Sequence, residues 1–236
     1  MLDFAHFDWI SFDCYGTLVD WESGILGCLR PLLQHKGHDL SDARILNLYS
    51  EFEPREQQSG EYRSYRDVLA SVVGDFAREL GFDVTSAEAA GLADSIREWR
   101  AFGDTVPALC ELKRGYRLAI LSNIDDELFR YSAEKLQVPL DCVVTAQQAR
   151  AYKPALGNFE LLLEKLSVPR SRLLHVAESL YHDVAPASSV GIATVWVNRR
   201  QGKAAAASKF CFVQPDVEVR DLDGLVKLAG TSRRNQ

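Results

Sequence analysis

The 236-residue sequence lacks closely spaced cysteines, long apolar runs and an excess of basic residues. An odd number of scattered cysteines is not typical of a disulfide framework or of a paired zinc site. No apolar stretch approaches the roughly 20 residues that span a bilayer, and the first residues lack the pattern of a signal peptide. We therefore expect a cytoplasmic protein that does not act on membranes. The cysteines are Cys14, Cys28, Cys110, Cys142 and Cys211.

The charge balance excludes further classes of function. The chain has 33 Asp and Glu against 27 Lys and Arg, a net charge of -6, whereas a broad nucleic-acid interface needs dense Lys and Arg. A local basic pocket for a small anion stays compatible with this balance. A Gly-rich fingerprint at the first strand–helix turn is also missing, which disfavours a nicotinamide-dependent oxidoreductase. These absences favour a small-molecule substrate and no nucleic-acid partner.

Short apolar segments alternate with helical patterns along most of the chain. Such alternation predicts an α/β fold, a Rossmann-like doubly wound parallel sheet with helices on both faces. The predicted strands are 7–13, 116–121, 142–145, 173–177 and 193–197, and the predicted helices between and after them are 105–114, 127–136, 158–166, 183–190 and 222–228.

The stretch from 23 to 99 has a different pattern. Its apolar residues recur at helical spacing and no segment is typical of a strand, so it predicts about four helices. The chain length suits one domain with a sizeable insertion. We predict a catalytic core at 1–20 and 101–236 and an inserted helical cap domain at 21–100, which covers one rim of the sheet.

Polar residues follow three of the predicted strands. Asp13 follows the first, Ser122 and Asn123 close the second, and Glu178 follows a third, with Asp183 nearby. In sheets of this kind ligands bind beyond the carboxyl ends of the strands. A lone Asp after a strand is more often a turn or capping residue. Polar groups from three separate segments at one rim instead favour an active site.

Two further residues extend this candidate site. Lys153 precedes Pro154 at the entry to a helix, where its ammonium group could neutralise Asp13 and a bound anion, although most lysines are simply solvated. Thr17, like Ser122 and Asn123, is a small donor that suits a nucleophile or a developing oxyanion. Turn and capping roles explain these small residues equally well.

Four segments together resemble the motifs of the haloacid dehalogenase-like superfamily. They are DCYGTLVD at 13–20, LSN at 121–123, YKP at 152–154 and ESLYHD at 178–183, in the same order over roughly the whole chain. The insertion at 23–99 resembles the helical cap of that superfamily. The resemblance implies that Asp13 is a carboxylate nucleophile, that Ser122 orients the substrate, and that Lys153 positions and neutralises Asp13.

The residue two positions after the nucleophile separates branches of this superfamily. Phosphatases carry a second Asp there as general acid, whereas this chain has Tyr15, whose phenol, with a pKa of about 10, is a poor acid at neutral pH. The first motif instead resembles that of the L-2-haloacid dehalogenases, in which the carboxylate displaces halide and water then hydrolyses the ester. Because halide leaves without a proton, no acid is needed. The sequence thus predicts a 2-haloacid dehalogenase.

The fourth motif departs from the dehalogenase pattern. Glu178 and Leu180 stand where the dehalogenases carry small polar residues. With Asp13 and Asp183, Glu178 resembles the magnesium site of the phosphatases, and carboxylates suit Mg²⁺. Alternatively, Lys153 offsets the charge of Glu178, and Glu178 positions the hydrolytic water. We favour a site without a metal or other cofactor, with Mg²⁺ on Asp13, Glu178 and Asp183 as the alternative.

The residues that hold the substrate are less clear from the sequence. The dehalogenases use a cap arginine for the substrate carboxylate, and Arg55, Arg63 and Arg66 lie in the corresponding region. An arginine fork matches a carboxylate, but these residues also suit an exposed helix face. Together with Tyr15, Trp99 and Phe102 are candidates for the apolar wall of a substrate pocket, although hinge packing explains the last two equally well.

Other functions stay open at this point. The segment ESLYHD also resembles relatives that open carbon–nitrogen bonds in small carboxylic acids, including cyclic amino acids. An amine leaving group would want a proton, for which Tyr15, Tyr181 or His182 would be candidates. A Mg²⁺-dependent phosphatase and a catalytically idle binding protein are the remaining alternatives. The dehalogenase resemblance is also compatible with a homodimer.

Overall fold

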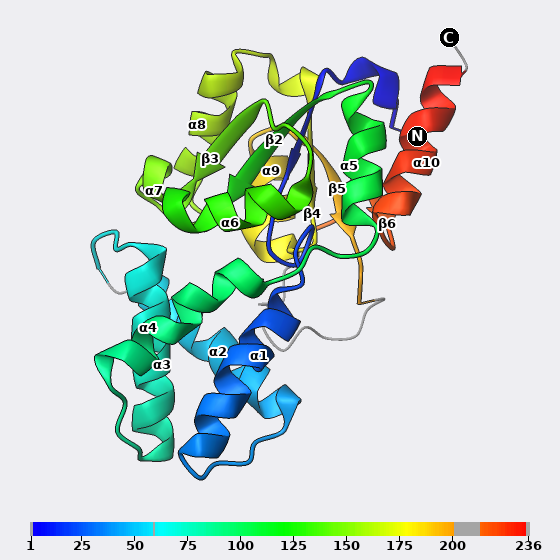
Figure 1. Ribbon diagram of the computed structural model, residues 1–236. Coiled ribbons are helices and arrows are strands. Elements are labelled where there is room, and N and C mark those ends of the chain that lie inside the picture. Colours follow the sequence, from blue (N-terminus) through cyan, green and yellow to red (C-terminus); the bar gives the residue numbers. More distant parts are fainter. Residues whose placement is uncertain (1, 59, 201–212, 235–236) are drawn as a thin grey trace.

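The computed structural model describes residues 2–58, 60–200 and 213–234 and shows a six-stranded parallel sheet (Figure 1). The strand order is β3-β2-β1-β4-β5-β6, so β1 lies in the middle and the chain turns to opposite sides of it. This is the doubly wound arrangement predicted from the sequence. The strands are β1 (Trp9–Phe12), β2 (Arg117–Ser122), β3 (Cys142–Thr145), β4 (Leu173–Ala177), β5 (Ala193–Val197) and β6 (Val217–Val219).

Helices cover both faces of the sheet because successive strand residues point to opposite sides. On one face Trp9 of β1 packs with Phe159 and Leu162 of α8. On the other face Ile10 and Phe12 belong to the larger cluster, which includes α5 and α10. The core helices are α5 (Thr105–Lys113), α6 (Asp126–Leu136), α7 (Ala146–Ala149), α8 (Gly157–Leu166), α9 (Ala185–Ser189) and α10 (Leu222–Arg234).

The structure corrects the predicted elements at several points, and it also contains the short helix α7, which was not predicted. The first strand begins at Trp9, because residues 4–6 form a 3-10 turn (η1, Phe4–His6) whose backbone the Asp3 side chain caps. The three-residue strand β6 was missed because it is too short to show a pattern. The helix predicted at 183–190 is a π-helical turn (η4, Leu180–Val184) followed by α9. Pro186, which lacks an N–H, fits only the first turn of α9.

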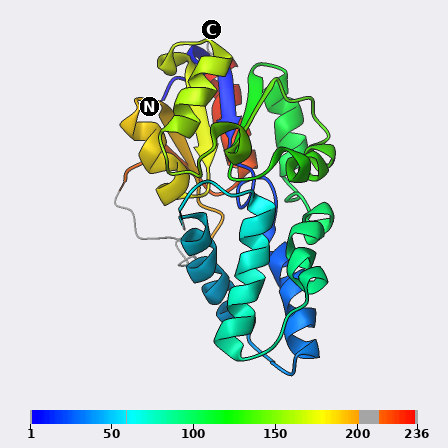
Figure 2. The ribbon, with the colours of Figure 1, turned by 90° about the vertical axis from the view of Figure 1, so that its left-hand side faces the viewer.

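The insertion forms four helices beyond the carboxyl ends of the strands (Figures 1 and 2). Ser41, Ser64 and Thr85 each accept a backbone N–H as N-caps of α2, α3 and α4, which explains where these helices begin. A 3-10 turn, η2 (Ile96–Glu98), leads back to the core. The helices are α1 (Trp21–His35), α2 (Asp42–Gln57), α3 (Tyr65–Leu80) and α4 (Ser86–Ser95).

Two features of the described residues bear on cellular context. None of their helices is long and apolar enough to cross a membrane. The four described cysteines are free, and Cys211 lies outside the described residues. The cytoplasmic location and the homodimer stay predictions.

Trp99 joins the insertion to the core. Its indole N–H donates to Ser95 Oγ at 3.0 Å, and its ring packs edge-on against Tyr15 with the centroids 5.6 Å apart. Gly24 of α1 lies directly against the same indole. A Cβ atom on Gly24 would come within 2.4 Å of the Trp99 ring. Glycine is therefore required at this position by the approach of α1 to Trp99.

We expect Gly24→Ala to lower the free energy of unfolding by about 1–3 kcal/mol, because the added methyl group overpacks the Trp99 contact. The control is Gly27→Ala on the same helix, where a Cβ meets no atom within 4 Å. That variant should gain roughly 0.5–1 kcal/mol from its lower backbone entropy. Urea denaturation measures both, and equal shifts of the two variants would contradict the packing explanation.

Candidate active site

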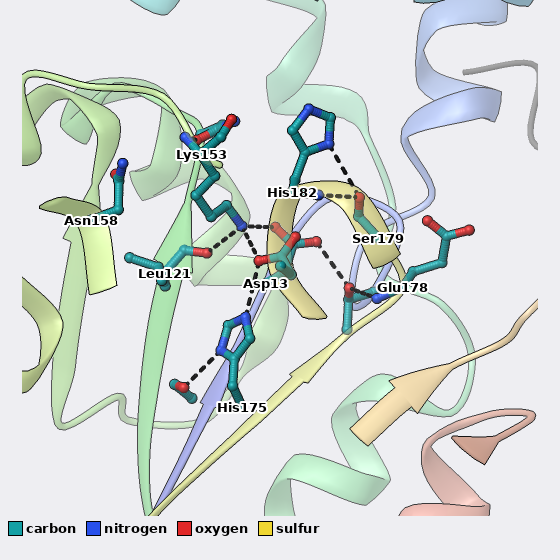
Figure 3. A network of polar contacts seen from close by, with 12 residues as sticks. Asp13, Leu121, Lys153, Asn158, His175, Glu178, Ser179 and His182 are labelled. Carbon is teal, nitrogen blue, oxygen red and sulfur yellow. Dashed lines mark hydrogen bonds and ion pairs between the residues drawn. The ribbon is translucent and has the colours of Figure 1, made fainter. Parts of the chain in front are cut away.

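The candidate site lies where β1 meets its two neighbours. Asp13 follows β1, Ser122 ends β2, and Glu178 follows β4, and these strands are adjacent. This is the position in a doubly wound sheet at which ligands bind. The structure thus brings together the polar residues that the sequence places at three separate strand ends (Figure 3).

Lys153 is the centre of the polar network in Figure 3. Its buried Nζ donates to Asp13 Oδ1 at 2.8 Å, to Asp183 Oδ1 at 2.6 Å and to the carbonyl oxygen of Leu121 at 2.9 Å. An ammonium group has three N–H donors, so all of them are used. Burial acts to lower the pKa of Lys153, but the two carboxylates outweigh it and raise that pKa above its usual value. Lys153 is therefore charged.

Thr17 holds the second oxygen of Asp13. The Thr17 hydroxyl donates to Asp13 Oδ2 at 2.9 Å and accepts the backbone N–H of Glu178 at the same distance. Arg199 fixes this loop in turn, because its guanidinium donates to the Thr17 carbonyl and pairs with Asp104. Burial raises the pKa of Asp13, while Lys153 and Thr17 oppose that shift. Both oxygens of Asp13 are thus fixed by the protein.

Ser122 and Asn123 have different roles. The Asn123 amide accepts the backbone N–H of Lys153 at 2.7 Å and donates to the Lys153 carbonyl at 3.1 Å, so it holds the Lys153 backbone. The Ser122 hydroxyl is buried and has no hydrogen-bond partner among the described residues. An unpaired buried hydroxyl costs about 1–3 kcal/mol. Because Ser122 lines a pocket, its hydroxyl is available to a ligand.

Sequence reasoning missed the support behind Asp183. His175 Nε2 lies 3.0 Å from Asp183 Oδ1, and its Nδ1 lies 2.8 Å from Ser11 Oγ. A carboxylate only accepts, so Nε2–H donates to Asp183, and in the neutral ring the Ser11 hydroxyl donates to Nδ1. Burial acts to raise the pKa of Asp183, but Lys153 and His175 lower it below its usual value. The sequence does carry a sign of this support, because Ser11 and His175 are polar residues within two otherwise apolar strands. They lie at paired positions of β1 and β4.

A pocket of about 130 Å³ opens beside Asp13, between the core and the inserted helices. It is slightly smaller than a cavity of about 150 Å³ that holds benzene, so it suits a small substrate. Tyr15 and Trp99 line it, as predicted. The sequence did not single out the other residues of its wall that come from the inserted helices, which are Trp21, Tyr49, Ser50, Glu53, Pro54 and Tyr65.

The structure places the three arginines offered for the substrate carboxylate away from this pocket. Arg55 pairs with Asp75 at 2.5 Å, Arg63 with Glu56 at 3.3 Å and Arg66 with Asp94 at 2.7 Å, and none of the three lines the pocket at Asp13. Their charges are used to join helices of the insertion to one another. Phe102 also lies outside this pocket, where it packs beneath the guanidinium group of Arg199 at 4.1 Å.

Among the described residues, the arginine that lines this pocket is Arg200, which follows β5. It pairs with Glu22 of α1, and its Nε lies 3.5 Å from Glu178 Oε1. Burial raises the pKa of Glu178 to about 7, and the charge of Arg200 opposes that shift. In Figure 3 the Glu178 side chain extends toward α1, away from Lys153. Sequence reasoning missed Arg200 because it searched the inserted helices alone.

The three carboxylates of the alternative magnesium set, Asp13, Glu178 and Asp183, all line the pocket but do not share a single partner. In the part of the chain that the structure describes, no three His, Cys, Asp or Glu side chains are grouped to hold a metal ion. Lys153 Nζ lies between Asp13 and Asp183, and Glu178 is turned toward Arg200. The positive charge beside Asp13 and Asp183 is thus that of the Lys153 ammonium group, and the site without a metal stays a prediction.

Comparison with known proteins places this site in a family. The family model of the haloacid dehalogenase-like hydrolases matches residues 7–191. The chain belongs to this family. It is 27% identical over 226 residues to an (S)-2-haloacid dehalogenase of Pseudomonas sp. strain YL, with 94% of each protein covered. It is 29% identical over 195 residues to haloacetate dehalogenase H-2 of Moraxella sp. strain B, with 80% of this chain and 85% of that protein covered.

The fold agrees with this assignment. The crystal structure of an L-2-haloacid dehalogenase superposes with a TM-score of 0.81 and 21% identity, over 95% of this chain and 99% of that protein. At this identity the likeness shows the fold of the haloacid dehalogenase-like hydrolases and nothing finer.

Tyr15 sets this hydrolase apart from family members with an acid at that position. Its ring lines the pocket, but its hydroxyl lies 2.8 Å from Ser132 Oγ on α6. Burial raises the pKa of the phenol well above its usual value, against the opposing hydrogen bond of Ser132. Tyr15 therefore supplies an aromatic wall and is a poorer proton donor than an ordinary tyrosine.

We expect Tyr15→Phe to keep kcat within about threefold of the wild type on a 2-haloacid, since an acid–base group contributes about 100-fold or more and this phenol supplies none. Ser132→Ala is the matched control, because it removes the other half of the same hydrogen bond. Both should lose about 1 kcal/mol of stability. Steady-state kinetics and thermal unfolding check this, and a 100-fold drop in kcat for Tyr15→Phe alone would assign the phenol a chemical role.

Proposed function

We propose that this protein hydrolyses a small carboxylic acid at C2 through an ester of Asp13, with halide as the leaving group, as a 2-haloacid dehalogenase does. The observation that carries the proposal is the buried carboxylate of Asp13, which Lys153 and Thr17 fix at the edge of a small pocket. The residue two positions further on, Tyr15, is not a carboxylic acid, and its hydroxyl is engaged by Ser132. The two relatives described above, both dehalogenases by name, support it.

In the first step an oxygen of Asp13 attacks C2, the carbon–halogen bond breaks, and the halide departs with the bonding electrons. No proton moves, in keeping with the engaged hydroxyl of Tyr15. Asp13 becomes a neutral ester, yet Lys153 stays paired with Asp183 at 2.6 Å. The ammonium group then remains beside the ester oxygen, where it polarises the carbonyl for the second step.

In the second step water attacks the ester carbon of Asp13, and Glu178 accepts its proton. The departing alkoxide oxygen takes the second proton of that water to give the 2-hydroxy acid, the Asp13 carboxylate is restored, and Glu178 releases its proton to solvent. The net reaction consumes the haloacid and water and yields the hydroxy acid, halide and one proton. A base with a pKa of about 7, as burial gives Glu178, suits proton abstraction at neutral pH.

Arg200 and Ser122 are proposed to hold the substrate carboxylate. Both line the pocket. The three donors of Lys153 are already used, whereas the Ser122 hydroxyl has no partner among the described residues. A guanidinium group matches a carboxylate in shape and charge. The proposed reaction uses no metal ion, because Lys153 supplies the positive charge between Asp13 and Asp183.

The wild-type protein should release chloride from one enantiomer of 2-chloropropionate at a rate that EDTA does not change. Asp13 attacks C2 once and the ester is cleaved elsewhere, so the lactate should have inverted configuration. In a single turnover with excess enzyme in ¹⁸O-labelled water, the label should enter Asp13 and not the product. Ion chromatography, chiral chromatography and peptide mass spectrometry measure these outcomes.

The matched variant is Asp13→Asn, which should fold normally and lose turnover by several orders of magnitude. Label in the first product molecule would mean direct attack by water and would remove Asp13 from the nucleophile role. Hydrolysis of para-nitrophenyl phosphate that EDTA abolishes would mean a metal-dependent phosphatase instead.

Activity should fall as the pH drops below about 7, because only ionised Glu178 accepts a proton and burial raises its pKa to about 7. Glu178→Gln should lower kcat by about 100-fold or more and abolish this acidic limb. Glu22→Gln removes the other partner of Arg200 outside the pocket. In this variant the loss of activity at low pH should remain but occur at a lower pH. The reason is that the charge of Glu22 raises the pKa of Glu178, and the substitution removes that charge. A wild-type kcat that is flat from pH 5.5 to 8 would contradict this role.

A further inference from the structure

Glu53 is the pocket carboxylate that the proposed reaction does not use. It lies on α2 and lines the pocket from the side of the inserted helices. Asp13 and Asp183 pair with Lys153, and Glu178 pairs with Arg200. Glu53 accepts hydrogen bonds only from neutral groups among the described residues, the Tyr65 hydroxyl at 3.2 Å and the Gln57 side-chain amide. It is thus a half-buried acid at the pocket without a basic partner in the described chain.

Aromatic rings surround the same part of the pocket. Trp21 and Tyr49 stack at a tilt with centroids 5.6 Å apart, and the Tyr49 and Tyr65 hydroxyls are 3.0 Å apart. All three line the pocket. The electron-rich faces of such rings attract cations. A carboxylate beside several aromatic rings is a chemical environment that favours an ammonium group over a neutral alkyl group.

The protonation of Glu53 agrees with this reading. Burial raises its pKa to about 7, against the opposing hydrogen bond of Tyr65. A cation bound beside Glu53 would restore the ionised form. Beside a purely apolar substrate Glu53 gains no such partner, and its burial is compensated only by protonation.

We propose that the substrate is a small carboxylic acid that also carries an ammonium group, which Glu53 and the rings of Trp21, Tyr49 and Tyr65 bind. This inference rests on the proposed displacement at C2. The substrate carboxylate would contact Arg200 and Ser122 on the core side, while its ammonium group would contact Glu53 on the side of α2. The two ends of the molecule are thus selected by residues from the two layers of the pocket.

The pocket volume limits how far apart these two groups can be. With about 130 Å³, compared with about 150 Å³ for a cavity that holds benzene, the ammonium group is one or two bonds from C2.

The test compares two isosteric substrates, 3-amino-2-chloropropionate and 2-chlorobutanoate, which differ in an ammonium group against a methyl group. We expect kcat/KM of the wild type for chloride release to favour the amino compound by about 10- to 100-fold, the range of a hydrogen bond to a charged group. Glu53→Gln should abolish that preference without lowering kcat/KM for 2-chlorobutanoate. Glu51→Gln, an exposed acid on the same helix, should keep the preference. An enzyme-free blank corrects for spontaneous chloride loss.

A binding measurement separates this inference from the proposed reaction. Calorimetric titration of the wild type with 3-aminopropionate and with its isostere butanoate needs no turnover. Tighter binding of 3-aminopropionate by the wild type, lost in Glu53→Gln, would support the ammonium site. If neither chloro acid reacted, the proposed displacement would be rejected, but this support for the ammonium site would stand. Equal binding of the two acids, or a wild-type preference for 2-chlorobutanoate, would overturn the ammonium site. If Glu53→Gln fails to fold, the wild-type comparisons still decide.

Discussion

The buried ammonium group of Lys153 lies between Asp13 and Asp183, and the rest of the site depends on that contact. Burying either carboxylate alone would be costly, and removal of one partner leaves an uncompensated charge in the interior. Lys153 also donates to the carbonyl of Leu121. It therefore joins the end of β2, the loop after β1 and the π-helical turn η4. The same contacts of Lys153 therefore hold these three segments together and neutralise the charges of the two carboxylates.

This arrangement also suits the proposed role of Asp13 as a nucleophile in a buried site. In the proposed reaction Asp13 loses its charge on esterification, and the ammonium group would be left unpaired if Asp13 were its only partner. Asp183 remains ionised because Lys153 and His175 lower its pKa, against the effect of burial. His175 and Ser11 extend this support into the sheet. The permanent pair lets the charge on Asp13 change while Lys153 stays where it is.

The two layers of the pocket contribute different properties. The core supplies Asp13 and the half-buried Glu178 from the ends of the adjacent strands β1 and β4, and Lys153 from the loop between α7 and α8. The inserted helices supply rings and Glu53, which do not contact Lys153 and have no part in the proposed bond changes. Tyr15 belongs to both, since it follows Asp13 closely but serves as an aromatic wall.

The sequence alone determined the alternation of strands and helices, the helical insertion and the rim residues. Each depends on local patterns, such as the apolar run that ends at Asp13. Only the tertiary structure decided which charged side chains reach the pocket. Glu53 and Arg55 are two residues apart on α2, and a helix turns by roughly 200° over two residues, so one lines the pocket while the other pairs with Asp75. Helix periodicity alone does not say which face meets the core, because that depends on how the inserted helices pack over the sheet.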